Sequence, residues 1–414
     1  MRIRSPFALL AALCVAGLVC SAVPSVSAAT TLTVRDVGAL AGFQTSTPSW
    51  DVQPGDFNGD GWTDVFFSHH GQPGELYRNR HPDGSSAGFT LFATFKDRRH
   101  HWHDRHGCAW GDVNQDERPD IVCMKGAKQG TVKKWNELWI QQPDRTFRDR
   151  AHDYGVEDVW GRGRHPSFID INHDRWPDLF LGNDMPRLDG NPTPNRTFVN
   201  EGGTTYSQVF MGLTKEMGAH CVQTVDLNHD GWDDLVLCAN TGLQLLIRAG
   251  DRFVDRRADL GIPAIRPTRA LVADLDGDGW EEILTMGGGS VRIYPNDGSG
   301  SFGDAWSHPL TAGRGLAVGD VDGSGSPDVL AVQGCVDSIN QTDVLLLNGG
   351  DLTSWTDMPN MPADVPGCGD AAAALDFDHD GMDDLVIQNG AYVRAGVLPG
   401  PDQLLTLGSW GLGA

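Results

Sequence analysis

The chain has 414 residues and a formal net charge of −23 at pH 7, from 32 basic and 55 acidic residues. Hydrophobic residues make up 40% of the chain, which is too many for a disordered protein. The negative charge disfavours duplex nucleic acid or an anionic bilayer as the main partner, because both would repel the protein. We therefore expect a folded protein without a nucleic-acid partner.

The N-terminal segment has the pattern of an export signal. Arg2 and Arg4 precede an apolar stretch, Phe7 to Val19, that is too short to span a bilayer, and small residues surround Val26-Ser27-Ala28. A lipid anchor on Cys20 is disfavoured because no small residue stands directly before it. We expect cleavage after about residue 28, secretion of a monomer, and no membrane span.

One nine-residue pattern, with oxygen-bearing side chains at positions 1, 3, 5 and 9, occurs seven times. The copies begin at Asp56, Asp112, Asp170, Asp226, Asp274, Asp320 and Asp376. A short apolar run precedes each copy and a second follows it at once, and a third and often a fourth come later in the repeat. Such runs between turn residues predict strands. Four strands in roughly fifty residues predict an all-β fold, a seven-bladed β-propeller of four-stranded antiparallel blades over residues 29–414.

The last blade needs a further strand to close the ring. The N-terminal segment, about residues 31–37, is similar to the fourth strands of the other repeats, so we expect it to pair with the C-terminal blade. The segment 403–407 fits the same place, and the sequence leaves both alternatives open.

The acidic loops predict calcium sites. Ca²⁺ accepts six to eight oxygen ligands in flexible geometry, including a backbone carbonyl, and glycine at position 6 permits the sharp turn. An EF-hand is excluded because strands flank the loops and because position 12 holds Phe67, Cys123 and Leu181 in the first three copies. Acidic loops without a cation would suffer like-charge repulsion. We predict up to seven Ca²⁺ ions.

The expected ligands occupy positions 1, 3, 5, 7 and 9 of each loop, with position 7 offering its carbonyl oxygen. In chain order they are Asp56, Asn58, Asp60, Trp62, Asp64; Asp112, Asn114, Asp116, Arg118, Asp120; Asp170, Asn172, Asp174, Trp176, Asp178; Asp226, Asn228, Asp230, Trp232, Asp234; Asp274, Asp276, Asp278, Trp280, Glu282; Asp320, Asp322, Ser324, Ser326, Asp328; and Asp376, Asp378, Asp380, Met382, Asp384. Loop 6 should be weakest because Ser324 replaces a carboxylate. Glu117 and Arg175 stand where glycine would relieve strain in loops 2 and 3.

Repeats of the form D-x-[DN]-x-D-G-x-x-D followed by an apolar strand resemble FG-GAP/VCBS repeats, the blades of the integrin α-subunit propeller. The resemblance covers about residues 31–410. It implies a seven-bladed propeller with Ca²⁺ between the first and second strands of each blade, on one face that we call the lower face. It leaves the function open, because this fold hosts adhesion domains, lectins and polysaccharide lyases.

Signal cleavage would leave six of the eight cysteines in an oxidising compartment. Two pairs share one hairpin register and predict cross-strand disulfides within blades 2 and 4. Opposite residues in an antiparallel ladder alternate between a shorter and a longer Cα–Cα distance, so one of the two pairs would need a bulge to reach a suitable distance. A third pair remains to link blades 6 and 7; six free thiols are the alternative. The expected pairs are Cys108 with Cys123, Cys221 with Cys238, and Cys335 with Cys368.

The other connections should form the opposite, upper face, where basic residues and histidines gather. The expected ligand-binding residues are Arg98, Arg99, His100, His101, His103, His106, Lys133, Lys134, Arg164, His165, His220, Arg269 and Arg314. The equivalent positions in blades 1 and 7 hold Trp50 with Asp51, and Asp370. One interpretation is an anion-binding funnel. The other is that these side chains pair with carboxylates of the upper loops.

We expect an extracellular recognition module that binds a glycan or protein ligand, which can be anionic, through the upper face. The alternative is a lyase that acts on an acidic polysaccharide, with His103, His106, His165, His220 and Arg269 as candidate catalytic residues. The spacing of His101 and His103, or of His103 and His106, also permits a Zn²⁺ or Cu²⁺ site, although no pattern enforces its geometry.

Overall fold

The computed structural model of the protein describes residues 34–43, 49–81, 88–96, 104–126, 132–184, 193–213, 218–336, 339–358, 361, 368–390 and 401–407. All of them belong to one unit, Thr33–Ala414. The predicted export signal, residues 1–28, lies outside the described residues. Within them, no helix combines the length and the apolar character that a membrane crossing requires.

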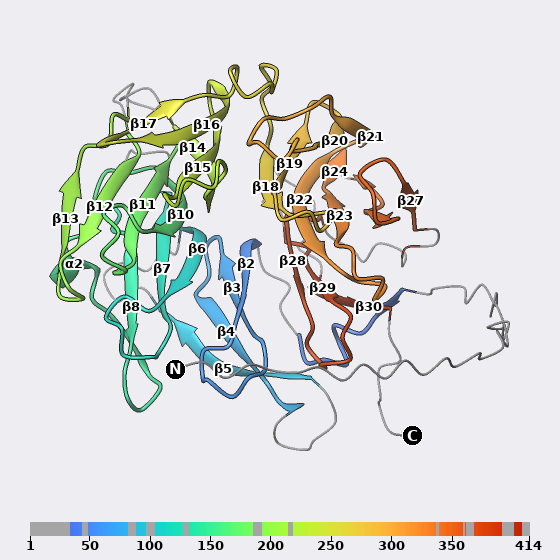
Figure 1. Cartoon of the computed structure of the whole chain (residues 1–414). Helices are drawn as coiled ribbons and strands as arrows, with labels where there is room; N and C mark the ends of the chain where they lie inside the picture. Colours follow the sequence, from blue (N-terminus) through green and yellow to red (C-terminus); the bar gives the residue numbers. More distant parts are fainter. Residues whose placement is uncertain are drawn as a thin grey trace, which may run out of the picture. The chain divides into compact units, whose positions relative to one another are not determined.

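The described strands form seven four-stranded antiparallel sheets (Figure 1). Each sheet is one blade, and we number the blades in chain order. Blade 1 contains β2 (Ser49–Gly55), β3 (Asp64–His69), β4 (Gly74–Asn79) and β5 (Phe89–Phe95). Blade 2 contains β6 (Arg105–Gly111), β7 (Asp120–Lys125), β8 (Glu137–Gln141) and β9 (Phe147–Asp149), followed by one helical turn, α2 (Ala151–Tyr154). Blade 3 contains β10 (Gly163–Ile169), β11 (Asp178–Asn183), β12 (Arg196–Asn200) and β13 (Tyr206–Val209).

The later blades repeat the same order. Blade 4 contains β14 (Ala219–Val225), β15 (Asp234–Ala239), β16 (Gly242–Ala249) and β17 (Arg252–Asp255). Blade 5 contains β18 (Arg269–Ala273), β19 (Glu282–Gly287), β20 (Ser290–Tyr294) and β21 (Trp306–Pro309). Blade 6 contains β22 (Gly313–Gly319), β23 (Asp328–Gln333), β26 (Val344–Asn348) and β27 (Trp355–Asp357), with a small hairpin of β24 (Cys335–Val336) and β25 (Ile339–Asn340) inserted before β26.

Blade 7 is built from both ends of the chain. Its strands are β28 (Ala371–Leu375), β29 (Asp384–Gln388), β30 (Gln403–Thr406) and β1 (Arg35–Asp36). The C-terminal strand β30 is therefore third in the sheet, and the N-terminal strand β1 pairs with it as the outer strand (Figure 1). The two segments that the sequence left as alternatives occupy different places in the same blade.

The first strands of neighbouring blades contact one another all the way round, including β28 with β2. The second strand of each blade lies between two others and packs against the next blade, which is why β3, β7, β11, β15 and β23 are buried along their whole length. An apolar cluster fills each interface between consecutive blades. The fold is therefore the closed seven-bladed propeller that the repeat predicts.

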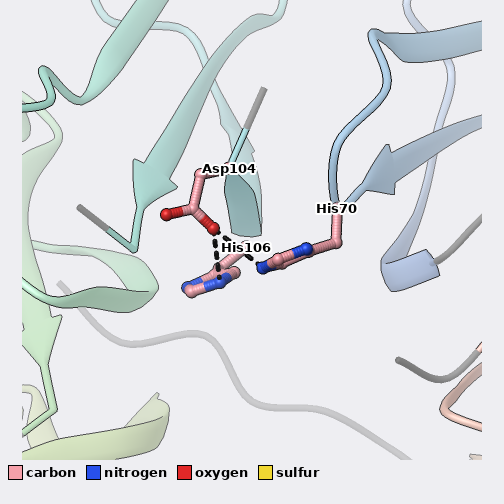
Figure 2. Close-up of side chains that lie close together, drawn as sticks. All are labelled: His70, Asp104 and His106. Carbon is pink, nitrogen blue, oxygen red and sulfur yellow. Dashed lines mark ion pairs between the residues drawn. The ribbon is translucent and has the colours of Figure 1, made fainter. Parts of the chain in front are cut away.

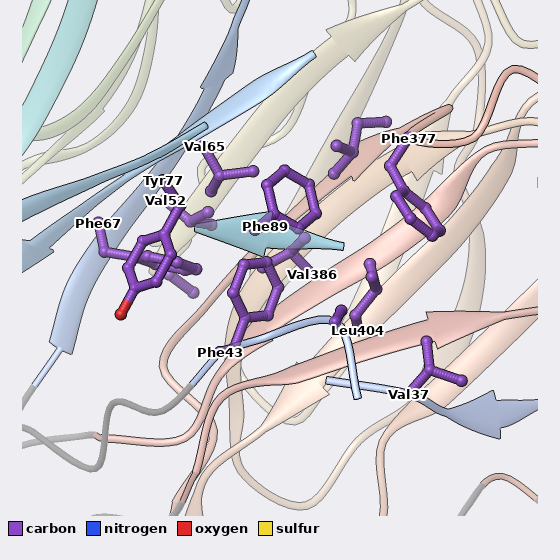
Figure 3. Packing of buried hydrophobic residues seen from close by; sticks show 13 residues of the cluster. Val37, Phe43, Val52, Val65, Phe67, Tyr77, Phe89, Phe377, Val386 and Leu404 are labelled. Atoms are coloured by element: carbon purple, nitrogen blue, oxygen red, sulfur yellow. The ribbon is translucent and has the colours of Figure 1, made fainter. Parts of the chain in front are cut away.

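The interface between blades 7 and 1 depends on the N-terminal segment. Val37 and Phe43 pack there among Phe67, Phe89 and Phe377 (Figure 3). The backbone of the same segment bonds to both blades, because the Val37 N–H donates to the Leu404 carbonyl and the Phe89 N–H donates to the Ala41 carbonyl. The first residues of the propeller thus connect its last blade to its first.

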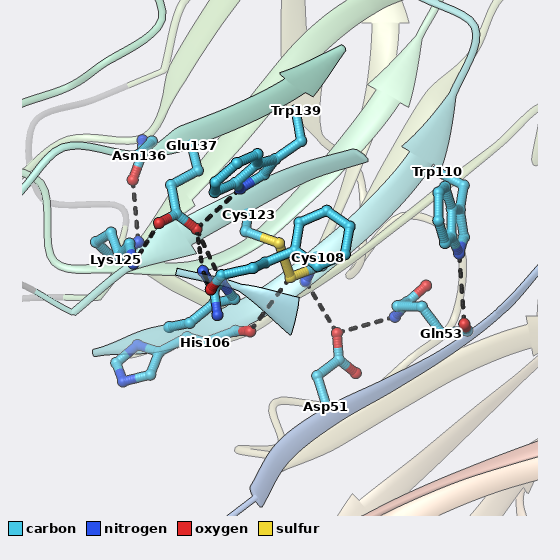
Figure 4. The surroundings of a disulfide bond; sticks show 12 residues. Asp51, Gln53, His106, Cys108, Trp110, Cys123, Lys125, Asn136, Glu137 and Trp139 are labelled. Atoms are coloured by element: carbon cyan, nitrogen blue, oxygen red, sulfur yellow. Dashed lines mark hydrogen bonds and ion pairs between the residues drawn. A yellow bond between two sulfur atoms is a disulfide. The ribbon is translucent and has the colours of Figure 1, made fainter. Parts of the chain in front are cut away.

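Three disulfides join the cysteine pairs that the sequence predicts: Cys108 with Cys123, Cys221 with Cys238, and Cys335 with Cys368. The first two pairs lie directly opposite each other in their ladders, and each ladder has a register irregularity next to the first cysteine. Figure 4 shows the first disulfide in blade 2. The third connects the β24–β25 hairpin of blade 6 to the residues that precede β28.

Candidate functional site

The nine-residue loops connect the first and second strands of each blade and share one hydrogen-bonding pattern. In all seven, the carboxylate at position 1 accepts the backbone N–H of position 6; in loop 1 the Gly61 nitrogen lies 2.7 Å from Asp56 Oδ2. The chain therefore curls around the first aspartate.

The acidic residue at position 9 is buried at the start of the second strand. In every loop its carboxylate accepts the backbone N–H of position 2, as Asp64 does from Phe57 at 3.2 Å. In six blades its other oxygen accepts the N–H of a residue at the end of the third strand or within two residues of that end, as Asp64 does from Asn79 at 2.7 Å. Position 9 therefore joins the loop to the sheet.

Burial and the neighbouring loop carboxylates raise the pKa of every position-9 acid. Burial is the larger cause, and the charges at positions 1, 3 or 5 add to it. The pKa of Asp64 rises from 3.8 to about 7, and that of Asp384 rises from 3.8 to about 8. Each loop thus concentrates negative charge that a cation would offset.

The donors in these loops fit a hard divalent cation. In loops 5, 6 and 7, carboxylate oxygens at positions 1, 3 and 9 lie within 4.8 Å of one another. The sets are Asp274, Asp276 and Glu282; Asp320, Asp322 and Asp328; and Asp376, Asp378 and Asp384. In loops 1 to 4, position 3 is asparagine, whose amide oxygen is an equally suitable ligand for Ca²⁺.

Two candidate ligand atoms in the loops are buried without a hydrogen-bond partner among the described residues. They are Oδ1 of Asn58, at position 3 of loop 1, and Oδ1 of Asp170, at position 1 of loop 3. A buried acceptor without a partner costs about 1–3 kcal/mol, and a bound cation would remove that cost. Both atoms are oxygens that the sequence assigns to a metal site.

The backbone strain expected at position 6 is present. Glu117 and Arg175 have φ angles of 64° and 69°, in the left-handed region where the other loops have glycine. The structure adds a second left-handed residue at position 4, where loops 3, 4 and 7 have histidine: His173, His229 and His379. The sequence did not reveal this position, because glycine occurs there in only three loops.

These position-4 histidines connect neighbouring loops by stacking on the position-7 tryptophan of the next blade. The ring centroids of His173 and Trp232 are 3.4 Å apart, and those of His229 and Trp280 are 3.9 Å apart. His379 stacks in the same way on Trp62 across the blade 7–1 interface, at 3.9 Å. These stacks join loop 3 to loop 4, loop 4 to loop 5, and loop 7 to loop 1.

A polar side chain at the end of the third strand provides a second connection, which the sequence analysis missed. The Asn200 Nδ2 donates to the Val113 carbonyl at position 2 of the preceding blade's loop, at 2.8 Å. Four other blades make the same bond through Asn79, Gln141, Arg248 and Asn348. The backbone N–H of each of these residues also bonds to the position-9 carboxylate of its own blade. One residue is therefore hydrogen-bonded to two consecutive loops.

On the upper face, the structure places Arg164, His165, His220, Arg269 and Arg314 at or near the starts of first strands. Arg164 bonds to Asp184 at 2.8 Å, as the second interpretation of these residues predicts. Within the described ranges, neither Arg269 nor Arg314 forms an ion pair with a carboxylate.

Asp370 lies near both arginines. Desolvation raises its pKa to about 6, while the positive charges of Arg269 and Arg314 act in the opposite direction. The upper end of the first strands therefore carries both acidic and basic groups. Its two arginines, Arg269 and Arg314, have no ion-pair partner in the described part of the chain.

Other residues expected on the upper face differ in accessibility. Lys134 and His106 are buried, with 5% and 3% of their surface exposed, so they offer little area to a large ligand. Lys125, from the same basic stretch, is buried against Glu137, with Nζ 2.8 Å from Oε1 (Figure 4). Lys133 is exposed and lies over the Trp160 ring. Arg98, Arg99, His100, His101 and His103 lie outside the described residues.

Comparison with known proteins identifies the repeat. The family described as FG-GAP-like repeat matches residues 56–123, 112–181, 170–237, 226–285 and 274–331, which together span more than half of the chain. No curated protein matches the sequence.

Similar solved structures share the fold at low sequence identity. An Agrocybe aegerita lectin that recognises non-reducing terminal N-acetylglucosamine is 16% identical, with a TM-score of 0.50, and covers 78% of this chain and 83% of its own. BBS1N, solved in complex with ARL6DN, is 10% identical, with a TM-score of 0.54 and coverage of 91% and 96%. The β-propeller domain of Swd1 from Myceliophteria thermophila is 10% identical, with a TM-score of 0.53 and coverage of 88% and 98%.

Proposed function

The chain belongs to the FG-GAP-like repeat family, and on that premise we propose that it is a secreted calcium-binding propeller whose upper face binds an extracellular glycan. The three disulfides support an extracellular location, because such bonds persist in oxidising compartments. The observation that carries the calcium assignment is the convergence of positions 1, 3 and 9 in loops 5, 6 and 7.

Each ion would be held by side-chain oxygens at positions 1, 3, 5 and 9 and by the carbonyl oxygen of position 7. Its chemistry is charge neutralisation and cross-linking within the loop. Because consecutive loops are joined by His–Trp stacks and by the third-strand side chains, an ion in one loop also stabilises the contact with its neighbour. Calcium would therefore stabilise the ring as a whole.

Calcium titration of the chelated protein tests this part of the proposal. Calorimetry should show up to seven ions per chain, and chelation should lower the melting temperature, since a ligand at 100 times its Kd stabilises the folded state by about 2.7 kcal/mol per site.

Ser324→Asp should strengthen calcium binding in loop 6 by adding the missing carboxylate. Ser207→Asp, which adds the same charge at an exposed position of β13, should not. An unchanged melting transition after complete metal removal would contradict calcium binding.

The ligand part of the proposal rests on the upper face. Arg269 and Arg314 are placed at the starts of first strands without an ion-pair partner among the described residues, and guanidinium groups bind carboxylate and sulfate in bidentate geometry. A lectin of the same fold recognises a sugar end, which supports a glycan. We therefore favour a glycan that carries uronate or sulfate groups.

A glycan array of uronic and sulfated polymers tests the ligand with the calcium-loaded protein. Wild type should bind, and the double variant Arg269→Ala, Arg314→Ala should lose binding. Arg256→Ala, which removes an exposed arginine paired with Asp259, should bind like wild type. Unsaturated products detected by ultraviolet absorbance would instead favour a lyase. Absence of binding to every acidic polymer would contradict the proposed ligand class.

A further inference from the structure

Two histidines and one aspartate from neighbouring blades meet at the end of the strands opposite the calcium loops. His70 directly follows β3 of blade 1, and Asp104 and His106 stand at the start of β6 of blade 2. A β-bridge between His70 and Asp104 holds the two segments together. Asp104 Oδ1 lies 2.9 Å from His70 Nε2 and 3.4 Å from His106 Nε2, and Figure 2 shows both rings facing this carboxylate.

The other nitrogen of His106 is fixed by the backbone of blade 3. Nδ1 lies 2.6 Å from the Gly163 carbonyl oxygen, which accepts only a donated proton, so Nδ1 carries the hydrogen and the Nε2 lone pair faces Asp104. Arg164 Nη1 lies 2.9 Å from the same Nδ1 and 3.0 Å from the Gly163 oxygen. Because Nδ1 is then a donor, the guanidinium donates to the carbonyl, and Asp184 balances its charge at 2.8 Å. A metal-ligating histidine commonly has this arrangement.

Packing holds the His106 ring in place on its other sides. The Trp50 ring stacks on it with centroids 4.0 Å apart. At Gly126, an added Cβ would lie 2.2 Å from His106 Cε1, so only glycine leaves room for the ring in this position. His106 and Asp104 are both buried at 3% exposure. The ring position is therefore determined by the fold before any ligand binds.

We propose that His70, Asp104 and His106 form a binding site for a divalent transition-metal ion, with Zn²⁺ as the best-suited ion. The three ligand atoms lie within 4.8 Å of one another. Tetrahedral Zn²⁺ holds ligands at about 2.0–2.2 Å, which places neighbouring ligand atoms about 3.3–3.6 Å apart. The measured separations of 2.9 and 3.4 Å need only a small expansion to admit the ion.

The ligand set distinguishes this site from the calcium loops. Two imidazole nitrogens suit Zn²⁺, Cu²⁺ or Ni²⁺, whereas Ca²⁺ and Mg²⁺ prefer oxygen ligands alone. Three protein ligands leave a fourth position for water or for an oxygen of a bound molecule. The site joins blades 1 and 2 on the upper face, and it stands whether or not that face binds a glycan.

Spectroscopy with Co²⁺ as a probe tests the site in the full-length protein. The chelated chain is first reloaded with Ca²⁺, so that the oxygen sites are filled, and is then titrated with Co²⁺. Wild type should bind one Co²⁺ with the intense visible absorption of a four-coordinate ion, and one equivalent of Zn²⁺ should abolish this absorption. X-ray absorption spectra of the Zn²⁺ form should show two imidazole ligands.

His70→Ala should lose the four-coordinate Co²⁺ spectrum, and Asp104→Asn should weaken Co²⁺ binding. His308→Ala is the matched control, because His308 forms a similar pair with Asp357, at 3.1 Å, in blades 5 and 6 and should not affect the spectrum. Circular dichroism and the calcium-dependent melting transition verify that the variants fold. Three outcomes would contradict the proposed metal site. They are no stoichiometric Co²⁺ binding by wild type, an unchanged spectrum in His70→Ala, or Zn²⁺ ligands that include no imidazole.

Discussion

Glu137 lies at the centre of a buried ion network in blade 2. Its Oε1 lies 2.8 Å from Lys125 Nζ and its Oε2 lies 2.6 Å from Arg105 Nη2, and the Trp139 indole N–H also donates to Oε2 (Figure 4). Burial alone would raise the pKa of Glu137, but the charges of Arg105 and Lys125 outweigh it and lower the pKa from 4.5 to about 2. The carboxylate is therefore ionised in the folded protein at all ordinary pH values.

Glu137→Gln should destabilise the protein by about 3–5 kcal/mol at pH 7, because two buried cations lose their counter-charge. Since the folded pKa is depressed, this contribution is complete above about pH 4.5 and is lost as the pH falls towards 2. The difference between wild type and variant in urea unfolding should shrink over that window. Asp259→Asn, which removes an exposed ion pair, should cost less than about 1 kcal/mol. Equal effects of the two changes would contradict the network.

Individual loop residues show where a sequence is and is not informative. The strain at Glu117 and Arg175 could be predicted, because four of the other five loops have the same glycine-containing pattern D-G at positions 5 and 6. The left-handed His173 at position 4 could not, because an exposed histidine before a ligand position has no special spacing. Its role becomes visible only once the Trp232 ring of the next blade is seen to stack on it.

At the scale of strands, the sequence predicts whatever depends on fixed spacing. The hairpin of strands 1 and 2 has a loop of constant length, so the cross-strand position of Cys108 and Cys123 follows from counting, and the structure has that disulfide. The connection to the third strand varies in length. The separation between the position-9 acid and its partner near the end of the third strand is 15 residues at Asn79, 22 at Asn200 and 14 at Asn296. This variation hid the side chains that join consecutive loops.

The upper face depends even less on regular spacing. His70 directly follows β3 of blade 1 and His106 lies at the start of β6 of blade 2. Because β4 and β5 separate them in sequence, their proximity arises only from the packing of two blades. In the sequence, the histidines of residues 100–106 form a local cluster, whereas in the structure His106 meets Asp104 and His70, and His70 comes from outside that cluster. Sites formed between elements of variable spacing require the structure.

At the scale of the whole propeller, closure is a property of the two chain ends. Blades 1 to 5 are formed from consecutive strands and blade 6 skips only the inserted β24–β25 hairpin, but blade 7 needs β1, which lies more than 360 residues from β30 in sequence. The Asp36 carboxylate accepts a bond from Gln403 Nε2 at 3.0 Å, and residues 37–43 continue to the blade 1 interface. The N-terminal segment is therefore part of two interfaces at once.

Phe43→Ala should test how much this closure contributes to stability. The Phe43 ring is buried at 2% exposure, with its centroid 5.3 Å from Phe67 and 4.9 Å from Phe89, and its loss should cost about 3–5 kcal/mol in urea unfolding of the calcium-loaded protein. Leu40→Ala is the control from the same segment, because Leu40 is 67% exposed and should change stability by less than about 0.5 kcal/mol. If both variants unfold like wild type, the N-terminal segment does not stabilise the ring, and closure depends on the C-terminal strand and the loops alone.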